Sequence, residues 1–295
     1  MTDLHRERIA LSTGVKLDVT LGGSEDAPAV IFLHGFPESA RTWRYQLADL
    51  AADYRVVAPD QRGFARSSKP ADVSDYTPDK PVGDLFALAD ALGIDRFTLV
   101  GHDWGGAIAW AAALGRPDRI ERLAIVNAPH PYVFQKSMFD DAGQRAASQY
   151  IRAFRTPGME THIADNLDNF FEKSFGHSGM GPVASAEDRA HFMDEWSQPG
   201  AMPAMLNWYR AAQIIVPEVG EDAARPAYLD QPFPVLGIPT LVVWGMQDKA
   251  LTPSQLEGLD ELVADLTIVR VEDAGHFVTW ERPEAVTTAL REFLA

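Results

Sequence analysis

Cysteine is absent from the 295-residue chain. Disulfides, thiol nucleophiles and cysteine-based metal sites are therefore excluded. The sequence also lacks an uninterrupted apolar run of about 18 residues, which a membrane-spanning helix would need. Its first eight residues, MTDLHRER, contain no apolar signal segment. We therefore expect a protein that is not inserted in a membrane and is located in the cytoplasm.

Positive charge is scarce relative to negative charge. The chain has 26 lysines and arginines against 42 aspartates and glutamates, which gives a formal net charge of -16. Nucleic-acid binding relies on clustered basic residues that contact phosphates, and no basic run is present. We therefore exclude nucleic acid as a partner. The acidic balance favours a soluble protein with a neutral or cationic small-molecule ligand, and it predicts no particular oligomeric state.

Apolar strand-like runs alternate with helical patterns in the first 127 residues and again near the carboxyl end. The alternating run 17–21 is typical of an antiparallel or edge strand, whereas the continuous apolar runs are typical of strands buried on both faces. Repeated alternation of this kind predicts an α/β fold with a mostly parallel sheet and right-handed connections. The predicted buried strands are 29–33, 54–60, 97–100, 123–127, 239–245 and 266–271, and the predicted helices are 43–51, 81–93 and 283–294.

The stretch from about residue 131 to residue 231 interrupts this alternation. It has no strand-like run of comparable strength, and its aromatic-rich helical segments are separated by loops that contain glycine and proline. The helical segments are 150–154, 167–175 and 203–212, and the loops are 176–182 and 198–200. We predict a core formed by residues 1–131 and 232–295, with residues 132–231 inserted as a helical cap.

A strand, a sharp turn and a helix are predicted around Asp103, within Gly101-His102-Asp103-Trp104-Gly105. The pattern Gly-x-nucleophile-x-Gly places a reactive side chain at a strained turn, where small neighbours avoid clashes. Serine usually occupies this position. A carboxylate would form an alkyl ester instead of an acyl-serine, which favours attack at an sp3 carbon. Both epoxides and haloalkanes fit this expectation.

Three residues that follow predicted strands are candidates for catalysis. Asp103, Asp248 and His276 occur in the order nucleophile, acid, histidine that is typical of the α/β-hydrolase arrangement. We expect Asp103 to attack, Asp248 to orient His276, and His276 to take a proton from the water that hydrolyses the ester. The backbone N–H groups of Phe36 and Trp104 are predicted to form an oxyanion hole. His102, beside the nucleophile, is interpreted as hydrogen-bonding or packing support.

Five features of the sequence belong to one recognisable set. They are His34-Gly35-Phe36-Pro37-Glu38-Ser39, Asp60-Gln61-Arg62-Gly63-Phe64, Gly101-His102-Asp103-Trp104-Gly105-Gly106, Asp248 and Gly275-His276-Phe277. Together they resemble the α/β-hydrolase-fold epoxide hydrolases over nearly the whole chain. The resemblance implies a mostly parallel eight-stranded sheet flanked by helices, an inserted helical cap, and hydrolysis of a small apolar epoxide to a vicinal diol by water, without a cofactor or metal. Asn127 stands where some related enzymes place their acid and cannot ionise, which favours Asp248. Ala65 stands where related hydrolases often have glycine.

The resemblance also implies roles for two cap tyrosines. In the family, two cap tyrosines hydrogen-bond the epoxide oxygen, and the sequence settings of Tyr150 and Tyr209 resemble theirs. Opening an epoxide creates an alkoxide, to which a phenol can donate. For the substrate-binding walls we expect an apolar pocket with aromatic sides, built from Phe36, Trp104 and Trp208, with Phe134, Phe139 and Met205 as further candidates.

Two other functions are compatible with parts of the pattern. A haloalkane or haloacetate dehalogenase of the same fold also uses an aspartate nucleophile, often beside a tryptophan such as Trp104, but it has no need of the paired tyrosines. A noncatalytic binding protein could keep the fold after losing catalytic residues. All the expected catalytic residues are present, so the sequence favours the epoxide hydrolase.

Overall fold

A single mixed sheet forms the centre of the protein. The computed structural model describes residues 4–176 and 183–295. Within them one eight-stranded sheet has the order β1-β2-β4-β3-β5-β6-β7-β8, in which β1 and β2 run antiparallel to their neighbours and all other pairings are parallel. The predicted fold class is confirmed. The strands are β1 (His5–Ala10), β2 (Lys16–Gly22), β3 (Ala29–Leu33), β4 (Arg55–Pro59), β5 (Phe97–His102), β6 (Ile120–Val126), β7 (Thr240–Gly245) and β8 (Leu266–Val271).

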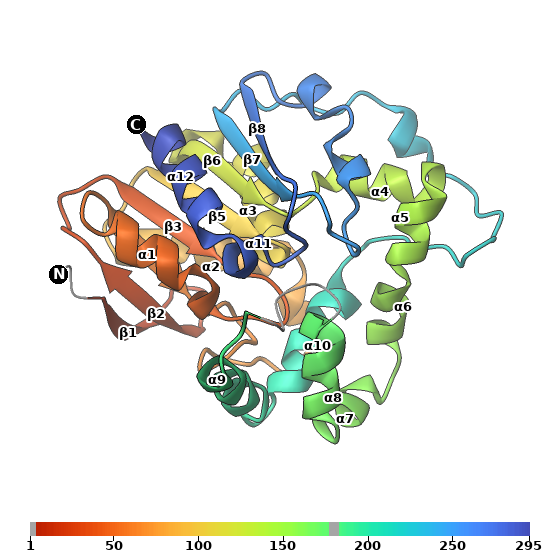
Figure 1. Cartoon of the computed structure of the whole chain (residues 1–295), viewed down its shortest axis with the longest axis horizontal. Coiled ribbons are helices and arrows are strands. Elements are labelled where there is room, and N and C mark those ends of the chain that lie inside the picture. The colour runs from red at the N-terminus through yellow and green to blue at the C-terminus, as the bar shows by residue number, and fades with distance from the viewer. Residues whose placement is uncertain (1–3, 177–182) are drawn as a thin grey trace.

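Helices cover both faces of the sheet, as its continuously apolar strands require (Figure 1). In β3, Ile31 and Leu33 face the side covered by α2 and α3, whereas Val30 and Phe32 face the side covered by α1 and α12. Successive side chains point to opposite faces, so a run such as Ala29–Leu33 fills two cores at once. The helices of the core are α1 (Arg44–Leu50), α2 (Asp79–Ala91), α3 (Trp104–Gly115), α11 (Val278–Glu281) and α12 (Pro283–Leu294).

In the described residues between β6 and β7 there are seven α-helices and no strand. Figure 1 shows most of them grouped beside the sheet, with α6 to α10 away from its helix-covered faces. The division into 1–131, 132–231 and 232–295 remains a prediction. The helices are α4 (Pro131–Asp140), α5 (Ala142–Ala147), α6 (Gln149–Arg155), α7 (Met159–Ala164), α8 (Leu167–Phe171), α9 (Ala186–Trp196) and α10 (Ala201–Ala211).

Local structure departs from the sequence expectations at three places. Strand β1 was not expected, because its sequence, HRERIA, is polar and exposed; pairing with β2 creates it. The predicted helix 167–175 is split, with α8 ending at Phe171 and a π-helical turn spanning Glu172–Gly176. The predicted buried strand 266–271 is β8, which lies at the edge of the sheet and is mostly partly or fully exposed. Ala65 has a φ of 42°, in the left-handed region that favours glycine, which agrees with the glycine that the resemblance implies there. Residues 177–182 of the predicted loop 176–182 lie outside the described residues.

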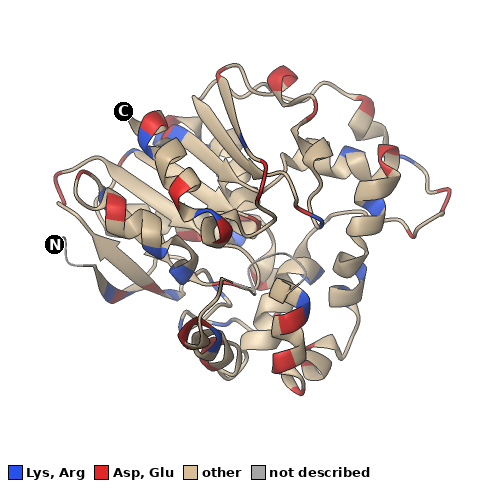
Figure 2. Ribbon diagram, in the orientation of Figure 1, with Lys and Arg blue, Asp and Glu red and all other residues tan. Residues whose placement is uncertain are grey.

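Charged residues are interspersed around the outside of the ribbon and are few in the central strands (Figure 2). Among residues 4–176 and 183–295, no helix combines the length and the apolar character needed to cross a bilayer.

Candidate active site

The backbone at Asp103 is strained by the turn between β5 and α3. Asp103 has φ 50° and ψ -120°, a conformation that residues other than glycine rarely adopt. Close packing leaves no room for a side chain two residues before or two residues after Asp103. A Cβ at Gly101 would lie 2.4 Å from the carbonyl oxygen of Gly105, and a Cβ at Gly105 would lie 2.2 Å from that of Leu33. The two glycines of the Gly-x-Asp-x-Gly pattern are therefore required by the close packing of the turn.

The two carboxylate oxygens of Asp103 have different surroundings. Oδ1 accepts a hydrogen bond of 2.7 Å from the backbone N–H of Phe36. Oδ2 lies 3.6 Å from Nε2 of His276, and 12% of the Asp103 side chain is exposed. The N–H of Trp104 begins α3, where helix geometry supplies no intrahelical acceptor. Its role in an oxyanion hole remains a prediction. Oδ1 is therefore held by a backbone donor, whereas Oδ2 faces His276.

The acid and the histidine come from the loops after β7 and β8. Nδ1 of His276 lies 2.7 Å from Oδ2 of Asp248, whose other oxygen accepts hydrogen bonds from the backbone N–H groups of Ala250 (2.8 Å) and Leu251 (2.9 Å). Asn127 Nδ2 donates to Asp248 Oδ2 at 2.8 Å. The structure thus brings together the three residues predicted from chain order. Asn127, interpreted only as a non-ionisable residue, contacts the acid directly.

His276 and Asp103 each shift the pKa of the other toward its charged form. Burial lowers the pKa of His276, but the charges of Asp248 and Asp103 and their hydrogen bonds outweigh burial and raise this pKa well above its ordinary value. Burial raises the pKa of Asp103, but the hydrogen bond and charge of His276 outweigh burial and lower it. The pair therefore favours the charged form of each group, a carboxylate at Asp103 and an imidazolium at His276.

A second buried histidine supports the loop that carries His276. Nε2 of His102 lies 2.9 Å from the backbone carbonyl oxygen of His276, and its Nδ1 lies 2.9 Å from Oε2 of Glu38. Trp280 donates from Nε1 to Oε1 of Glu38 at 2.6 Å. Burial raises the pKa of Glu38, but the charge and hydrogen bonds around it outweigh burial and lower it. The supporting role expected for His102 agrees with these contacts. Glu38 was not identified as a site residue, because a carboxylate after a strand gives no signal that it will be buried.

The two cap tyrosines face the same cavity as Asp103. Tyr150 lies on α6 and Tyr209 on α10, and their ring centroids are 6.1 Å apart. Burial, then the charges of Asp103 and Asp248, raise the pKa of Tyr150. Burial, then Tyr150 and Asp103, raise the pKa of Tyr209 well above its ordinary value, against a lowering contribution from its hydrogen bond with Trp104. Both phenols are therefore protonated and able to donate.

The cavity has a volume of about 520 Å³ and mostly apolar walls. Its reactive groups are Asp103, His276, Tyr150 and Tyr209. The apolar lining comes mainly from Phe36, Phe154, Met159, Ile163, Phe170 and Phe277.

The expected aromatic walls are only partly correct. Phe36 lines the cavity, whereas Trp208, Phe134, Phe139 and Met205 do not. Trp208 is buried behind the site, donates from Nε1 to the carbonyl oxygen of Arg62 at 3.0 Å and packs against Phe64. Trp104 is also absent from the lining, because its ring packs against Tyr209 at a centroid distance of 5.1 Å. Composition marks a residue as apolar, but helix rotation decides whether it faces the core or the cavity. The candidates that do not line it are Trp104, Trp208, Phe134, Phe139 and Met205.

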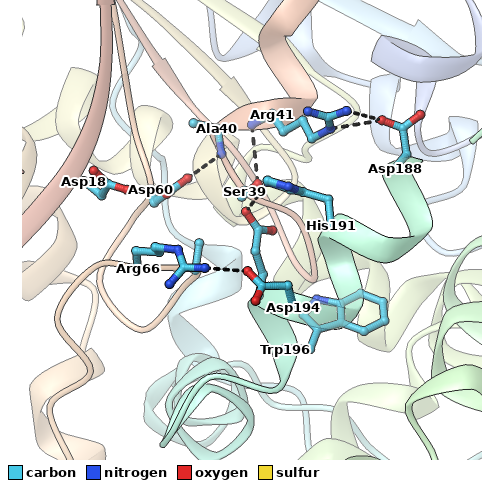
Figure 3. A network of polar contacts seen from close by, with 12 residues as sticks. Asp18, Ser39, Ala40, Arg41, Asp60, Arg66, Asp188, His191, Asp194 and Trp196 are labelled. Carbon is cyan, nitrogen blue, oxygen red and sulfur yellow. Dashed lines mark hydrogen bonds and ion pairs between the residues drawn. The ribbon is translucent and has the colours of Figure 1, made fainter. Parts of the chain in front are cut away.

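Polar contacts attach α9 to the loop that follows β3 (Figure 3). Arg41 donates from Nε and Nη2 to Oδ1 of Asp188 at 3.0 and 2.8 Å. Trp196 donates from Nε1 to the carbonyl oxygen of Pro37 at 2.8 Å. Pro37 directly follows Phe36, so these contacts fix the backbone donor that holds Asp103.

Known proteins resemble the chain over nearly its whole length. A family model described as alpha/beta hydrolase fold matches residues 28–283. The AB hydrolase superfamily protein YfhM of Bacillus subtilis is 34% identical over 96% of each chain. Epoxide hydrolase A of Mycobacterium tuberculosis is 31% identical over 98% of this chain and 97% of its own. A solved structure described among novel epoxide hydrolases in metagenomes from hot environments is 47% identical, with a TM-score of 0.87 over 99% of each chain. The chain therefore belongs to the α/β-hydrolase fold family and, within it, to the epoxide hydrolases.

Proposed function

We propose that the protein hydrolyses an epoxide to a vicinal diol through a covalent ester on Asp103. The observation that supports this reaction is the shared cavity, which is lined by Asp103 and by two protonated phenols, Tyr150 and Tyr209. A carboxylate alone fits attack on many sp3 carbons. Paired phenol donors fit a leaving oxygen that gains negative charge while it remains attached to the substrate.

In the first half-reaction, Asp103 Oδ2 forms a bond to one oxirane carbon. The bond between that carbon and the oxirane oxygen breaks, and its electron pair moves to the oxygen. Tyr150 or Tyr209 gives its proton to this oxygen, which becomes a hydroxyl of the product. The enzyme then carries a hydroxyalkyl ester and a tyrosinate.

In the second half-reaction, His276 Nε2 takes a proton from water while the water oxygen adds to the ester carbonyl carbon. The negative charge develops on Oδ1, which the N–H of Phe36 already contacts at 2.7 Å. Collapse of this intermediate releases the diol and restores the carboxylate of Asp103. Before water attacks, the imidazolium proton of His276 restores the tyrosine hydroxyl. The proton then taken from water restores the imidazolium, so that the sum of both steps is epoxide plus water giving diol.

A His276→Gln variant tests this mechanism by intact mass, because it allows the first half-reaction and blocks the second. With a panel of epoxides, we expect an adduct whose mass equals that of the whole epoxide. The double variant Asp103→Asn/His276→Gln is the matched control and should form none.

Two other outcomes would replace the proposal. Adducts formed only from haloalkanes, with loss of halide, would indicate a dehalogenase. We do not expect them, because the side chain of Trp104, the candidate halide donor, packs against the ring of Tyr209 at a centroid distance of 5.1 Å and does not line the cavity. An inactive wild type that forms no adduct would indicate a noncatalytic binding protein.

A further inference from the structure

Four polar residues of the cap line the cavity at its solvent side. His162, Asn166, Asn169 and Lys173 recur every three or four residues along α7, α8 and the following π-helical turn, and all four are exposed. This spacing places them on one side of the helical segment. Apolar residues of the same segment, such as Ile163 and Phe170, are buried and line the cavity as well. The cavity therefore has an apolar interior and a polar mouth.

Two lysines at this mouth have no partner within the described parts of the chain. Lys173 comes from the cap, and Lys249 comes from the core loop directly after Asp248; both are exposed and line the cavity. Neither ammonium group makes an ion pair or a side-chain hydrogen bond with any residue in 4–176 or 183–295. Several arginines of the cap are paired: Arg152 with Glu218, Arg189 with Asp168, and Arg210 with Glu160.

The charge of the cavity lining differs from that of the whole chain. Acidic residues outnumber basic ones by 42 to 26 in the sequence. Among the described lining residues, however, the only carboxylate is Asp103, and it is paired with His276. The ammonium groups of Lys173 and Lys249 therefore face the mouth without a neutralising lining carboxylate. Low-dielectric walls concentrate such a field in the cavity and its entrance.

We propose that the preferred substrates are epoxides that carry a carboxylate at the end remote from the oxirane. This inference rests on the proposed epoxide hydrolysis and adds the substrate class. The oxirane would lie between Asp103 and the two tyrosines, the apolar part of the molecule against the aromatic walls, and the carboxylate at the mouth near Lys173 and Lys249. The net charge of -16 favours neutral or cationic ligands for the molecule as a whole. At the mouth, the two lysines would instead attract an anionic group.

The first test compares ω-epoxy carboxylic acids of graded chain length with their methyl esters. The two compounds of each pair have the same oxirane and alkyl chain and differ in one charge. At chain lengths that let the carboxylate reach the mouth, we expect kcat/KM to be about tenfold higher for the acid, mainly through association and KM. This preference should shrink between about 0.02 M and about 0.5 M NaCl, because exposed charges are screened.

The second test uses the double variant Lys173→Gln/Lys249→Gln. We expect it to reduce kcat/KM for the acid about tenfold more than for the ester, and to remove the salt dependence of the acid. Lys136→Gln is the matched control, since Lys136 is exposed on α4 and does not line the cavity. It should keep the preference for the acid, and a thermal melt of each variant checks that the fold is retained.

The outcomes separate this inference from the function on which it rests. Wild type that hydrolyses the ester as well as or better than the acid at every length overturns the inference and leaves epoxide hydrolysis standing. Equal losses for acid and ester in the double variant also overturn it. Hydrolysis of neither compound would overturn the proposed function, and the inference with it.

Discussion

The core and the cap hold their functional groups in different ways. In the core, Asp103 and Asp248 receive hydrogen bonds from backbone N–H groups, three of them at 2.7 to 2.9 Å. In the cap, Tyr209 is held mainly by rings: its centroid lies 5.0 Å from that of Phe36 and 4.9 Å from that of Phe154. Tyr150 packs against Phe154 and Tyr209 at 5.8 and 6.1 Å.

The core carboxylates are thus positioned by backbone hydrogen bonds, and the cap tyrosines by side-chain packing. A backbone donor moves only if the loop moves, so the core carboxylates keep their geometry as long as the sheet is intact. Ring contacts restrict distance and angle less tightly than hydrogen bonds do, so they adapt to small shifts of a helix. We therefore expect the core to tolerate almost no change in its reacting groups, and the cap to lose function in graded steps.

The largest effect is expected from Asp103→Asn. The amide keeps the size of the side chain but is a poor nucleophile, so kcat should fall by at least about 10⁴-fold in an epoxide assay. The variant also removes one of the charges that raise the pKa of His276, so this pKa should fall. Heteronuclear NMR of the imidazole nitrogens measures it, with Asp248→Asn as a comparison. Retention of substantial turnover by Asp103→Asn would contradict the assignment of the nucleophile.

A graded loss is expected from the cap. Tyr150→Phe and Tyr209→Phe should each lower the rate of ester formation about 10- to 100-fold, because either phenol can still donate, and the double variant about 10³-fold or more. Single-turnover kinetics measures ester formation separately from its hydrolysis. Tyr132→Phe is the control, since that hydroxyl donates to the carbonyl oxygen of Leu229. If the single variants lost as much as the double, the two tyrosines would act as one unit and the contrast with the core would disappear.

The smallest effect is expected from Asn127→Leu. Asn127 donates to Asp248 Oδ2, and its own Oδ1 accepts from the backbone N–H of Gly245 at 2.8 Å. Leucine removes the acceptor of the buried N–H of Gly245 and one of the two contacts of Asp248 Oδ2, and it is unfavourable at the φ of 39°. The free energy of unfolding should therefore fall by about 2 kcal/mol. Urea unfolding measures the loss. An unchanged midpoint would mean that backbone contacts alone fix the acid.

The same contrast explains which features could be predicted from the sequence. Asp103, Asp248 and His276 were found because each follows a predicted strand, and the ends of parallel strands meet at one edge of a sheet. Strand β1 could not be found, since its polar residues carry no periodic signal and its pairing with β2 defines it.

Residues placed by packing were harder to predict. Tyr150 and Tyr209 were identified only through the resemblance to a family, and their catalytic roles remain predictions. Trp208 was expected in the pocket but lies behind it, because the rotation of α10 directs Tyr209 to the cavity and Trp208 to Arg62. Glu38 was missed altogether, since only the fold shows that its carboxylate is buried against His102.

The 3.6 Å separation between Asp103 and His276 has a consequence for the timing of the two half-reactions. In the resting site, two carboxylates hold a proton on the imidazole, and a protonated imidazole cannot take a proton from water. Under the proposed mechanism, ester formation removes the charge of Asp103 and so lowers the pKa of His276. His276 therefore becomes available as a base only after the first step, when there is an ester to hydrolyse.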